Sequence, residues 1–289
     1  MGVVTRLMGG TLITAAALLI TGCPPANDEV VDEPVVVDEE DPAGVPVCLL
    51  GEPFVASGEI QVRDAQPADA FRTGELRWQD YEGCERFVVD LVDEDGEPAE
   101  RAGEVTAEVL RELAVVRLQL RDVELGDFDH TDATFDGPLA RAAFVVSSPD
   151  GRWVWVDVHL GEPAEAFVTT LDEPARVILD LRPGGPAVPG PAPRENQVLV
   201  LEPRPGPASY PLTVTGYART FEANVVVRLE QAGQDVFDDF TTATAWADAW
   251  GHYSFTIEEG PSGPVVLHVG EYSAKDGTWQ GVAVELEMR

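Results

Sequence analysis

The chain has 289 residues and a net charge of −33, from 52 acidic and 19 basic residues. A surface this acidic repels phosphate backbones, which argues against DNA or RNA as a partner. The length is sufficient for two domains of ordinary size.

The first apolar run, residues 12–20, follows a single cation, Arg6. It is shorter than the roughly 20 apolar residues that a transmembrane helix needs. A basic start, a short apolar run and small residues after it are typical of a secretory signal peptide. The sequence Ile20-Thr21-Gly22-Cys23 resembles the bacterial lipobox, which implies cleavage before Cys23 and its lipidation. The alternative, a buried cysteine in an N-terminal helix, is disfavoured because Pro24-Pro25 would stop such a helix.

An acidic segment follows the expected anchor. Residues 24–46 contain eight acidic residues, five prolines and no basic residue, a composition that stays solvated and extended. We therefore expect a lipoprotein signal peptide at 1–22 and a Pro-rich tether at 23–46. The expected location is extracytoplasmic, on an outer membrane or on the outer leaflet of the cell membrane, with contact to the membrane through the lipid.

Two cysteines remain after Cys23, namely Cys48 and Cys84. An exported protein permits a disulfide, and an even remainder suits one. The sequence leaves open whether they are bonded or are two reduced, buried thiols.

The region 47–183 reads as an all-β domain. Its β-branched and aromatic runs are bounded by Gly, Pro and Asp, as strands are. The expected strands are 87–92, 115–120, 141–147, 152–160, 166–171 and 175–181. The sequence SPDG at 148–151 predicts a hairpin. Residues 104–113 are the only candidate helix, because Val105, Val109, Leu110 and Leu113 have helical spacing.

A run rich in Pro and Gly, within residues 184–196, predicts an unpacked linker. Strand patterns then resume over 197–289, in seven short segments separated by turn residues, which is typical of a β-sandwich. The expected architecture is two β-sandwich domains.

The second domain is similar to the Gmad-type immunoglobulin-like domain of bacterial spore-germination and other envelope proteins. The matching residues are Pro211, Val214, Gly216, Ala218, Phe221-Glu222-Ala223, and the segments 251–255 and 272–277. This resemblance implies an extracytoplasmic interaction module. From the residues themselves, we expect Gly216 to permit a bend, Phe221 to be core and Glu222 to be a polar strand residue, with Asp276-Gly277 in a turn.

Residues 135–183 resemble the end of AMIN-like domains. The last strand carries that pattern in Pro174, Arg176, Val177, Leu179 and Asp180. AMIN domains are envelope modules associated with peptidoglycan or envelope targeting, so this resemblance also implies binding.

The sequence has no serine-nucleophile elbow, zinc-protease motif, phosphate loop or dinucleotide fingerprint, and we expect neither catalytic residues nor a cofactor. The four histidines lack metal-ligand spacing. A weak calcium candidate is formed by Asp127, Asp129, Asp132 and Asp136. It departs from the helix-loop-helix signature, because Asp132 holds the position of the required glycine.

The tryptophans are the candidate binding residues. In the strand 152–160, alternation places Val154, Val156, Val158 and Leu160 on one face, and Trp153, Trp155, Asp157 and His159 on the other. If the aliphatic face is core, the two indoles point outward and can bind a glycan or a protein. The alternative is that they pack between domains, and the same choice applies to Trp246 and Trp250.

These observations predict a lipid-anchored, non-catalytic envelope protein that binds cell-wall polymer or another envelope protein. A solute- or calcium-binding lipoprotein is the alternative, and a cell-wall hydrolase is a third. The sequence leaves the oligomeric state open.

Overall fold

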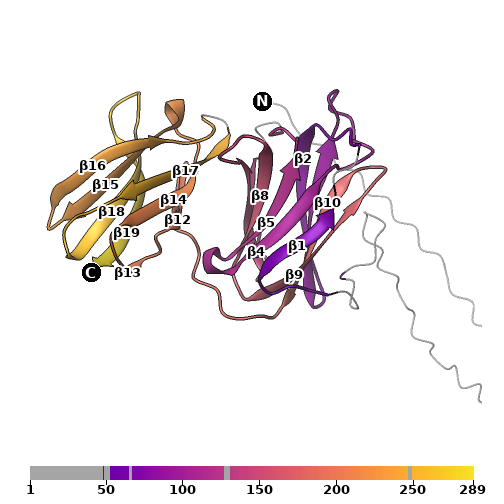
Figure 1. The fold of residues 1–289 in the computed structure, drawn as a ribbon, viewed down its shortest axis with the longest axis horizontal. Coiled ribbons are helices and arrows are strands. Elements are labelled where there is room, and N and C mark those ends of the chain that lie inside the picture. The colour runs from indigo at the N-terminus through magenta and orange to yellow at the C-terminus, as the bar shows by residue number, and fades with distance from the viewer. Residues whose placement is uncertain (1–47, 49–52, 65–66, 127–130, 247–248) are drawn as a thin grey trace, which may run out of the picture. The chain divides into compact units, whose positions relative to one another are not determined.

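The structure is a computed structural model that describes Cys48 and residues 53–64, 67–126, 131–246 and 249–289. The expected signal peptide, Cys23 and the acidic tether lie outside the described residues. The described chain consists almost entirely of β-strands, which confirms the predicted all-β fold class (Figure 1). Among the described residues, no helix is both long and apolar enough to cross a membrane.

The N-terminal module, residues 53–183, contains two sheets that face each other. β2, β3, β10 and β9 form a four-stranded antiparallel sheet, in that order. β1, β4, β5, β8 and β7 form one half of a ten-stranded sheet, with β6 paired to β7. The strands are β1 (Gly58–Arg63), β2 (Arg72–Tyr81), β3 (Cys84–Val92), β4 (Val105–Leu110), β5 (Val115–Arg121), β6 (Asp132–Thr134), β7 (Ala140–Ser147), β8 (Trp153–Leu160), β9 (Ala164–Leu171) and β10 (Arg176–Pro183).

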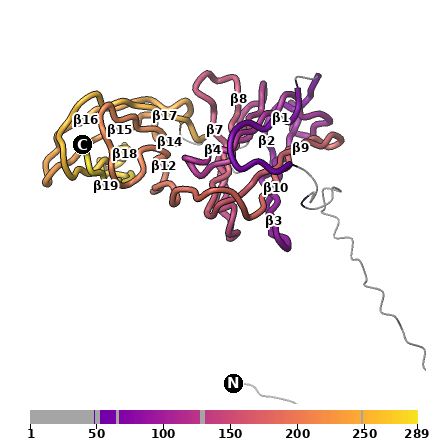
Figure 2. The backbone as a smooth tube through the Cα atoms, turned by 60° about the horizontal axis from the view of Figure 1, so that its bottom comes forward, coloured from indigo at the N-terminus to yellow at the C-terminus, as the bar shows by residue number. Residues whose placement is uncertain are grey.

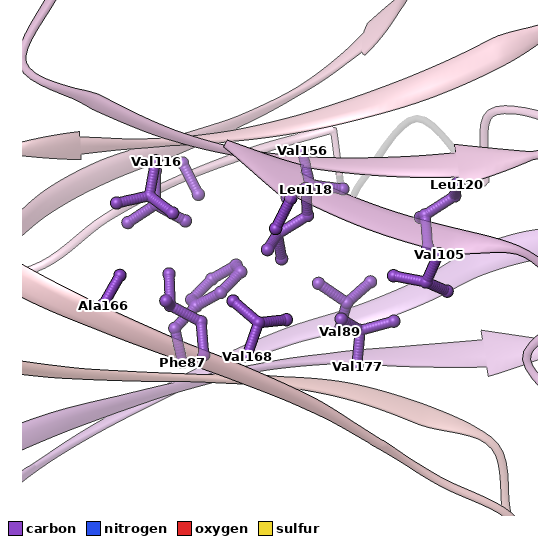
Figure 3. Packing of buried hydrophobic residues seen from close by; sticks show 14 of the residues in the cluster. Phe87, Val89, Val105, Val116, Leu118, Leu120, Val156, Ala166, Val168 and Val177 are labelled. Atoms are coloured by element: carbon purple, nitrogen blue, oxygen red, sulfur yellow. The ribbon is translucent and has the colours of Figure 1, made fainter. Parts of the chain in front are cut away.

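The core of the N-terminal module lies between these two sheets. Because successive side chains of a strand point to opposite faces, every second residue of β3 and β5 turns inward. Figure 3 shows Phe87 and Val89 of β3 meeting Val116 and Leu118 of β5, and all four are buried. The predicted SPDG hairpin is confirmed, because it joins the antiparallel pair β7 and β8.

The predicted helix at 104–113 is wrong. Residues 105–110 form strand β4, in which Val105, Ala107 and Val109 are buried and alternate with half-buried neighbours. Only Arg111–Leu113 is helical, as the short 3-10 turn η1. The same residues fit both periods, and the β-branched valines pack better in a sheet.

The C-terminal module, residues 197–289, is a second sandwich. β17, β14, β12 and β11 complete the ten-stranded sheet, and they face a five-stranded sheet of order β13, β19, β18, β15, β16. A separate apolar core that includes Val214, Val227, Leu267 and Val284 lies between them. The strands are β11 (Arg194–Glu195), β12 (Val198–Glu202), β13 (Gly206–Ala208), β14 (Leu212–Ala218), β15 (Asn224–Gln231), β16 (Gln234–Thr242), β17 (Trp250–Ile257), β18 (Gly263–Tyr272) and β19 (Trp279–Met288), with the 3-10 turn η3 (Phe221–Ala223).

The two modules share one sheet, because β17 pairs in parallel with β7 (Figure 2). The register places Trp250 opposite Val146 and Gly251 opposite Ser147. The Thr244 hydroxyl donates a hydrogen bond of 2.8 Å to the Ser147 carbonyl beside this pairing. Backbone hydrogen bonds therefore join the modules directly.

The segment between the modules packs against both of them. Arg194–Glu195 forms β11, which pairs with β12 of the C-terminal module. Val188 packs against the core of the N-terminal module, and Ala192 packs against an apolar cluster shared by both modules. The expectation that residues 184–196 would not pack is therefore wrong at both ends of this segment.

Cys48 and Cys84 are joined in a disulfide, with their Cα atoms 6.3 Å apart. Cys84 is the first residue of β3, so the bond ties residue 48 to the four-stranded sheet. Both cysteines are buried.

Gly216 is required by a close approach of neighbouring strands. It lies inside β14, paired with Val200 of β12 and Tyr253 of β17. A Cβ atom at this position would overlap the Leu199 carbonyl oxygen and the Tyr253 hydroxyl. The absent side chain lets three neighbouring strands come together around the Tyr253 ring.

Candidate functional site

The face of β8 that carries the tryptophans is largely covered by the C-terminal module. Asp157 has no exposed surface and His159 is 7% exposed. Trp155 is half-buried, with the Arg117 guanidinium 3.6 Å from its ring centre and the His252 ring at 5.7 Å. Of the two alternatives for this face, packing between the modules therefore holds for Trp155 and His159, and the outward binding surface does not. Trp153, at the start of β8, is also half-buried.

Trp250 and Trp246 lie in different environments. Trp250 is fully buried, and its ring packs edge-on against Phe144 at 5.2 Å. It belongs to the apolar cluster that both modules share, so for Trp250 the alternative of packing between the domains holds. Trp246 is 59% exposed and remains available to a partner. Of the predicted binding residues, Trp246 alone keeps a largely exposed side chain.

Polar residues cross the module interface beneath Trp155. Arg117 of β5 pairs with both carboxylate oxygens of Asp157, at 2.8 and 2.7 Å. The Tyr217 hydroxyl of β14 donates to Asp157 and accepts from Arg117 at 3.2 Å. Burial raises the pKa of Tyr217, and the charge of Asp157 adds to this. Burial alone would lower the pKa of Arg117, but Asp157 outweighs it and holds that pKa above its usual value. This triad satisfies buried charges across the interface.

The structure describes two of the four residues of the calcium candidate, Asp132 and Asp136. Asp132 pairs with Arg194 at 2.8 Å and with Arg219 at 3.1 Å, so its carboxylate is already neutralised. Asp136 is exposed, whereas Asp127 and Asp129 lie outside the described residues. Within the described ranges, no group of His, Cys, Asp and Glu side chains is arranged to hold a metal ion. Asp132 instead connects β6 to arginines before and within the C-terminal module.

A group of aromatic and charged side chains lies on the outward face of the five-stranded sheet. We call Arg228, His268, Tyr272 and Trp279 the aromatic face. The Trp279 ring lies 5.2 Å from Tyr272 and 6.3 Å from His268. The Arg228 guanidinium lies 5.1 Å from the Trp279 ring centre and donates to the Tyr272 hydroxyl at 3.2 Å. Tyr272 is 47% exposed, so the face is open to a partner.

Paired glycines lower the sheet surface beside the rings. Gly270 of β18 lies opposite Gly281 of β19, in the same row as Val226 and Phe240. A Cβ atom at Gly281 would lie 2.9 Å from a Trp279 ring carbon and 2.7 Å from the Gly270 Cα. The row thus falls from Phe240, which is 61% exposed, to two glycines, and the Trp279 ring lies beside Gly281 where a side chain would otherwise stand. The absent side chains make room for the Trp279 ring against the sheet.

An acidic groove continues the same face toward the other end of the strands. Its volume is about 810 Å³, and Glu230, Val266, Glu285 and Glu287 are among its lining residues. The charged residues among those that line it are all acidic. His268 lies 3.4 Å from Glu230 and so connects the groove to the aromatic face. The combined surface can accept a group with positive charge and apolar bulk.

The turn η3 adds one more exposed ring and overturns two expectations. Phe221 is 54% exposed, so its predicted core role is wrong. Glu222 lies in the turn at φ 56°, so it is not a strand residue. The Phe221 amide donates a 2.8 Å hydrogen bond to Glu271, which fixes the turn with the ring outward. The Asp276-Gly277 turn is as predicted, since Asp276 accepts from Thr278 at 2.7 Å.

Sequence reasoning missed the aromatic face, although a signal for it exists. In β18 the odd positions Val265, Leu267 and Val269 are buried, so His268 and Tyr272 must point outward. In β19 the even positions from Val282 onward are buried, which places Trp279 on that same outward side. Alternation in two adjoining strands thus groups these rings once the β18–β19 register is known.

The family match found for this chain lies in the C-terminal module. No curated protein matches the chain. Residues 197–278 match the family Gmad2, described as the immunoglobulin-like domain of bacterial spore germination, so the segment that carries most of the aromatic face resembles that domain.

Proposed function

We propose that this chain is a non-catalytic binding protein of the bacterial cell envelope, which docks onto a protein partner through the aromatic face and the acidic groove. The observation that carries this proposal is the grouping of Tyr272, Trp279 and Phe240 on one side of a continuous sheet. Exposed aromatic side chains that gather on one surface are typical of interaction sites. The match to an immunoglobulin-like domain supports a binding role, because such folds present surfaces on a rigid scaffold.

The charge of the site favours a basic protein segment over a cell-wall polymer. Peptidoglycan is itself anionic, and Glu230, Glu285 and Glu287 would repel it. A lysine or arginine side chain on a partner could instead form ion pairs with these carboxylates and cation–π contacts with the aromatic rings. Cell-wall polymer remains the competing partner that the experiment must separate.

The N-terminal part of the proposal concerns location. A lipid on Cys23 and the acidic tether would hold the two modules outside the cell at a membrane surface. The resemblance of residues 135–183 to AMIN-like domains supports the same envelope location. Mass spectrometry of the N-terminal peptide tests the anchor. We expect a peptide that begins at Cys23 and carries a diacylglyceryl group on that residue. A peptide that still includes residues 1–22, with no lipid on Cys23, would contradict the anchor.

The docking surface is tested by photo-crosslinking in intact cells. Benzoylphenylalanine is placed at Phe240 of β16, in the row of the two glycines, and in a second strain at Trp246, which is similarly exposed but lies in the segment after β16. We expect one discrete protein adduct from position 240 and none of that mass from position 246. The substitution Trp279→Ala should reduce the adduct at least tenfold.

Purified cell-wall sacculi form the second arm of the experiment. Sedimentation of the full chain with sacculi, lost in Trp279→Ala, would replace the protein partner by the polymer. Equal adducts from both crosslinker positions, with no sedimentation, would contradict docking through this face.

A further inference from the structure

A small cavity lies where the two modules meet, and both modules contribute to its wall. Its volume is about 90 Å³, which is about three water molecules' share of liquid volume. Phe144, His159 and Leu160 come from the N-terminal module, Leu199 comes from the C-terminal module, and Ala192 comes from the connecting segment. Arg141 and Arg194 also line it. An apolar enclosure thus carries two guanidinium groups and one imidazole.

The imidazole of His159 lacks a partner. Only 7% of His159 is exposed, and its Nε2 atom has no hydrogen-bond partner among the described residues. A buried nitrogen without a partner is unfavourable, so such an atom beside a cavity indicates a missing ligand. A neutral imidazole can carry its proton on Nε2 and donate it to an anion.

The charges around the cavity favour an anion. Arg194 and Arg219 share the carboxylate of Asp132, and Arg204 donates to the carbonyls of Gly190 and Leu113, with the charge of Glu202 nearby. Arg141 has no acidic partner within the described part of the chain. The wall therefore carries two arginines, Arg141 and Arg194, both on exposed residues and served by the one carboxylate of Asp132, in a protein of net charge −33. The cavity therefore favours an anion, whereas the acidic groove favours a cation.

Three arginines, Arg204, Arg194 and Arg117, also act on His159 through their charge. Burial lowers the pKa of His159 to about 4, and the charges of Arg204, Arg194 and Arg117 reinforce that effect, although Asp157 opposes it. A positive potential therefore reaches the imidazole from several sides.

We propose that this cavity binds one small oxyanion or carboxylate, held by the guanidinium groups of Arg141 and Arg194 and by Nε2–H of His159. Paired N–H donors of arginine match the geometry of carboxylate and phosphate oxygens. A bound anion would satisfy the orphaned imidazole and would contact residues of both modules. The site lies apart from the aromatic face and is independent of the docking proposal.

The test is a titration of the full chain, labelled with ¹⁵N in its histidines, at constant ionic strength. Sodium acetate, sodium phosphate and sodium sulfate are added against a sodium chloride background, and the His159 Nε2 resonance is followed. We expect a saturable shift with at least one of these anions, and the anion that produces it distinguishes a carboxylate from an inorganic oxyanion. The melting temperature should rise over the same concentration range.

Two variants assign the site. Arg141→Gln changes an exposed arginine at the cavity, so the fold is retained, and we expect its Kd to rise at least tenfold. Arg152→Gln is the matched control, because its side chain is 69% exposed and pairs locally with Asp150. Its Kd should equal that of the wild type. Absence of a saturable Nε2 shift with all three anions, or an unchanged Kd in Arg141→Gln, would overturn the proposal.

Discussion

The hydroxyl of Tyr217 in β14 donates a hydrogen bond to the carboxylate of Asp157 in β8, and so joins the two modules at a fully buried point. Asp157 is at the same time held by both nitrogens of the Arg117 fork. Because all three groups satisfy one another, the interface can contain a charge without leaving it unpaired. The backbone pairing of β7 with β17 adds a second connection near Trp250. The two sandwiches are therefore expected to unfold together.

Removal of the Tyr217 hydroxyl tests this connection. Tyr217→Phe leaves a buried carboxylate with one donor fewer, and should lower the free energy of unfolding by about 1.5–3 kcal/mol. Urea denaturation followed by tryptophan fluorescence measures the change. The matched control is Tyr210→Phe, whose half-buried hydroxyl makes only a long 3.4 Å contact with the Pro261 carbonyl, and it should change stability little. Equal effects of the two substitutions would argue against a special role for the Asp157 contact.

The buried ion pair of the N-terminal module should be far more sensitive than an exposed pair. Arg86 of β3 and Asp180 of β10 contact at 2.6 and 2.8 Å, and each side chain is 1% exposed. Asp180→Asn removes the carboxylate charge that contacts two nitrogens of the buried Arg86 guanidinium, so we expect a loss of about 3–5 kcal/mol in unfolding free energy.

The comparison is Asp172→Asn, which breaks the pair with Arg63, where the aspartate side chain is 42% exposed. Exposed pairs contribute about 0–1 kcal/mol, so this variant should remain close to the wild type in chemical denaturation. A small effect of Asp180→Asn would mean that water reaches Arg86.

Strand composition predicts much of this fold, but not all of it. The runs that became β3, β5, β7, β8, β9 and β10 are rich in Val, Ile and Phe, because these strands are buried on at least one face. Strand β2 was not predicted, because its sequence RTGELRWQDY carries charges and a glycine and is largely unburied. Strand β4 was assigned to a helix, because Val105 and Val109 satisfy both periods.

The candidate site was less predictable, for a different physical reason. Alternation correctly separates Trp155 and His159 from the aliphatic residues of β8, but it cannot say whether a second module covers that face. The covering residues, such as Tyr217 and Leu199, lie 40 or more positions later in the chain. Conversely, the aromatic face depends on the register between β18 and β19, which groups Tyr272 with Trp279.

Gly216 should tolerate no side chain. In Gly216→Ala the new methyl group would overlap the Leu199 carbonyl and the Tyr253 hydroxyl, so β12 or β17 must move. Overpacking of this kind destabilises by about 1–3 kcal/mol or more. The control is Gly190→Ala in the connecting segment, where a Cβ atom would meet nothing within 4 Å. Thermal unfolding should show a lower Tm for the first variant and an unchanged Tm for the second. An equal Tm in both would mean that the strands around Gly216 adjust easily.

The stability of the protein should fall as the pH is lowered from 6.5 toward 4, and His159 should account for part of that fall. Unfolded, this histidine takes up a proton near pH 6.5, whereas burial lowers its folded-state pKa to about 4. Between these values the unfolded state binds more protons, so acid favours unfolding, by up to about 3 kcal/mol from this group.

His159→Phe keeps an aromatic ring beside Phe144 and removes the titration. Unfolding free energies of both proteins are measured by urea denaturation from pH 7.5 to 4.5, in chloride buffers without oxyanions. His252, whose pKa burial also lowers, and the carboxylates titrate in both proteins, so the difference in slope isolates His159. A shallower slope for the variant is expected, and identical slopes would show that His159 is not neutral and buried in the folded protein.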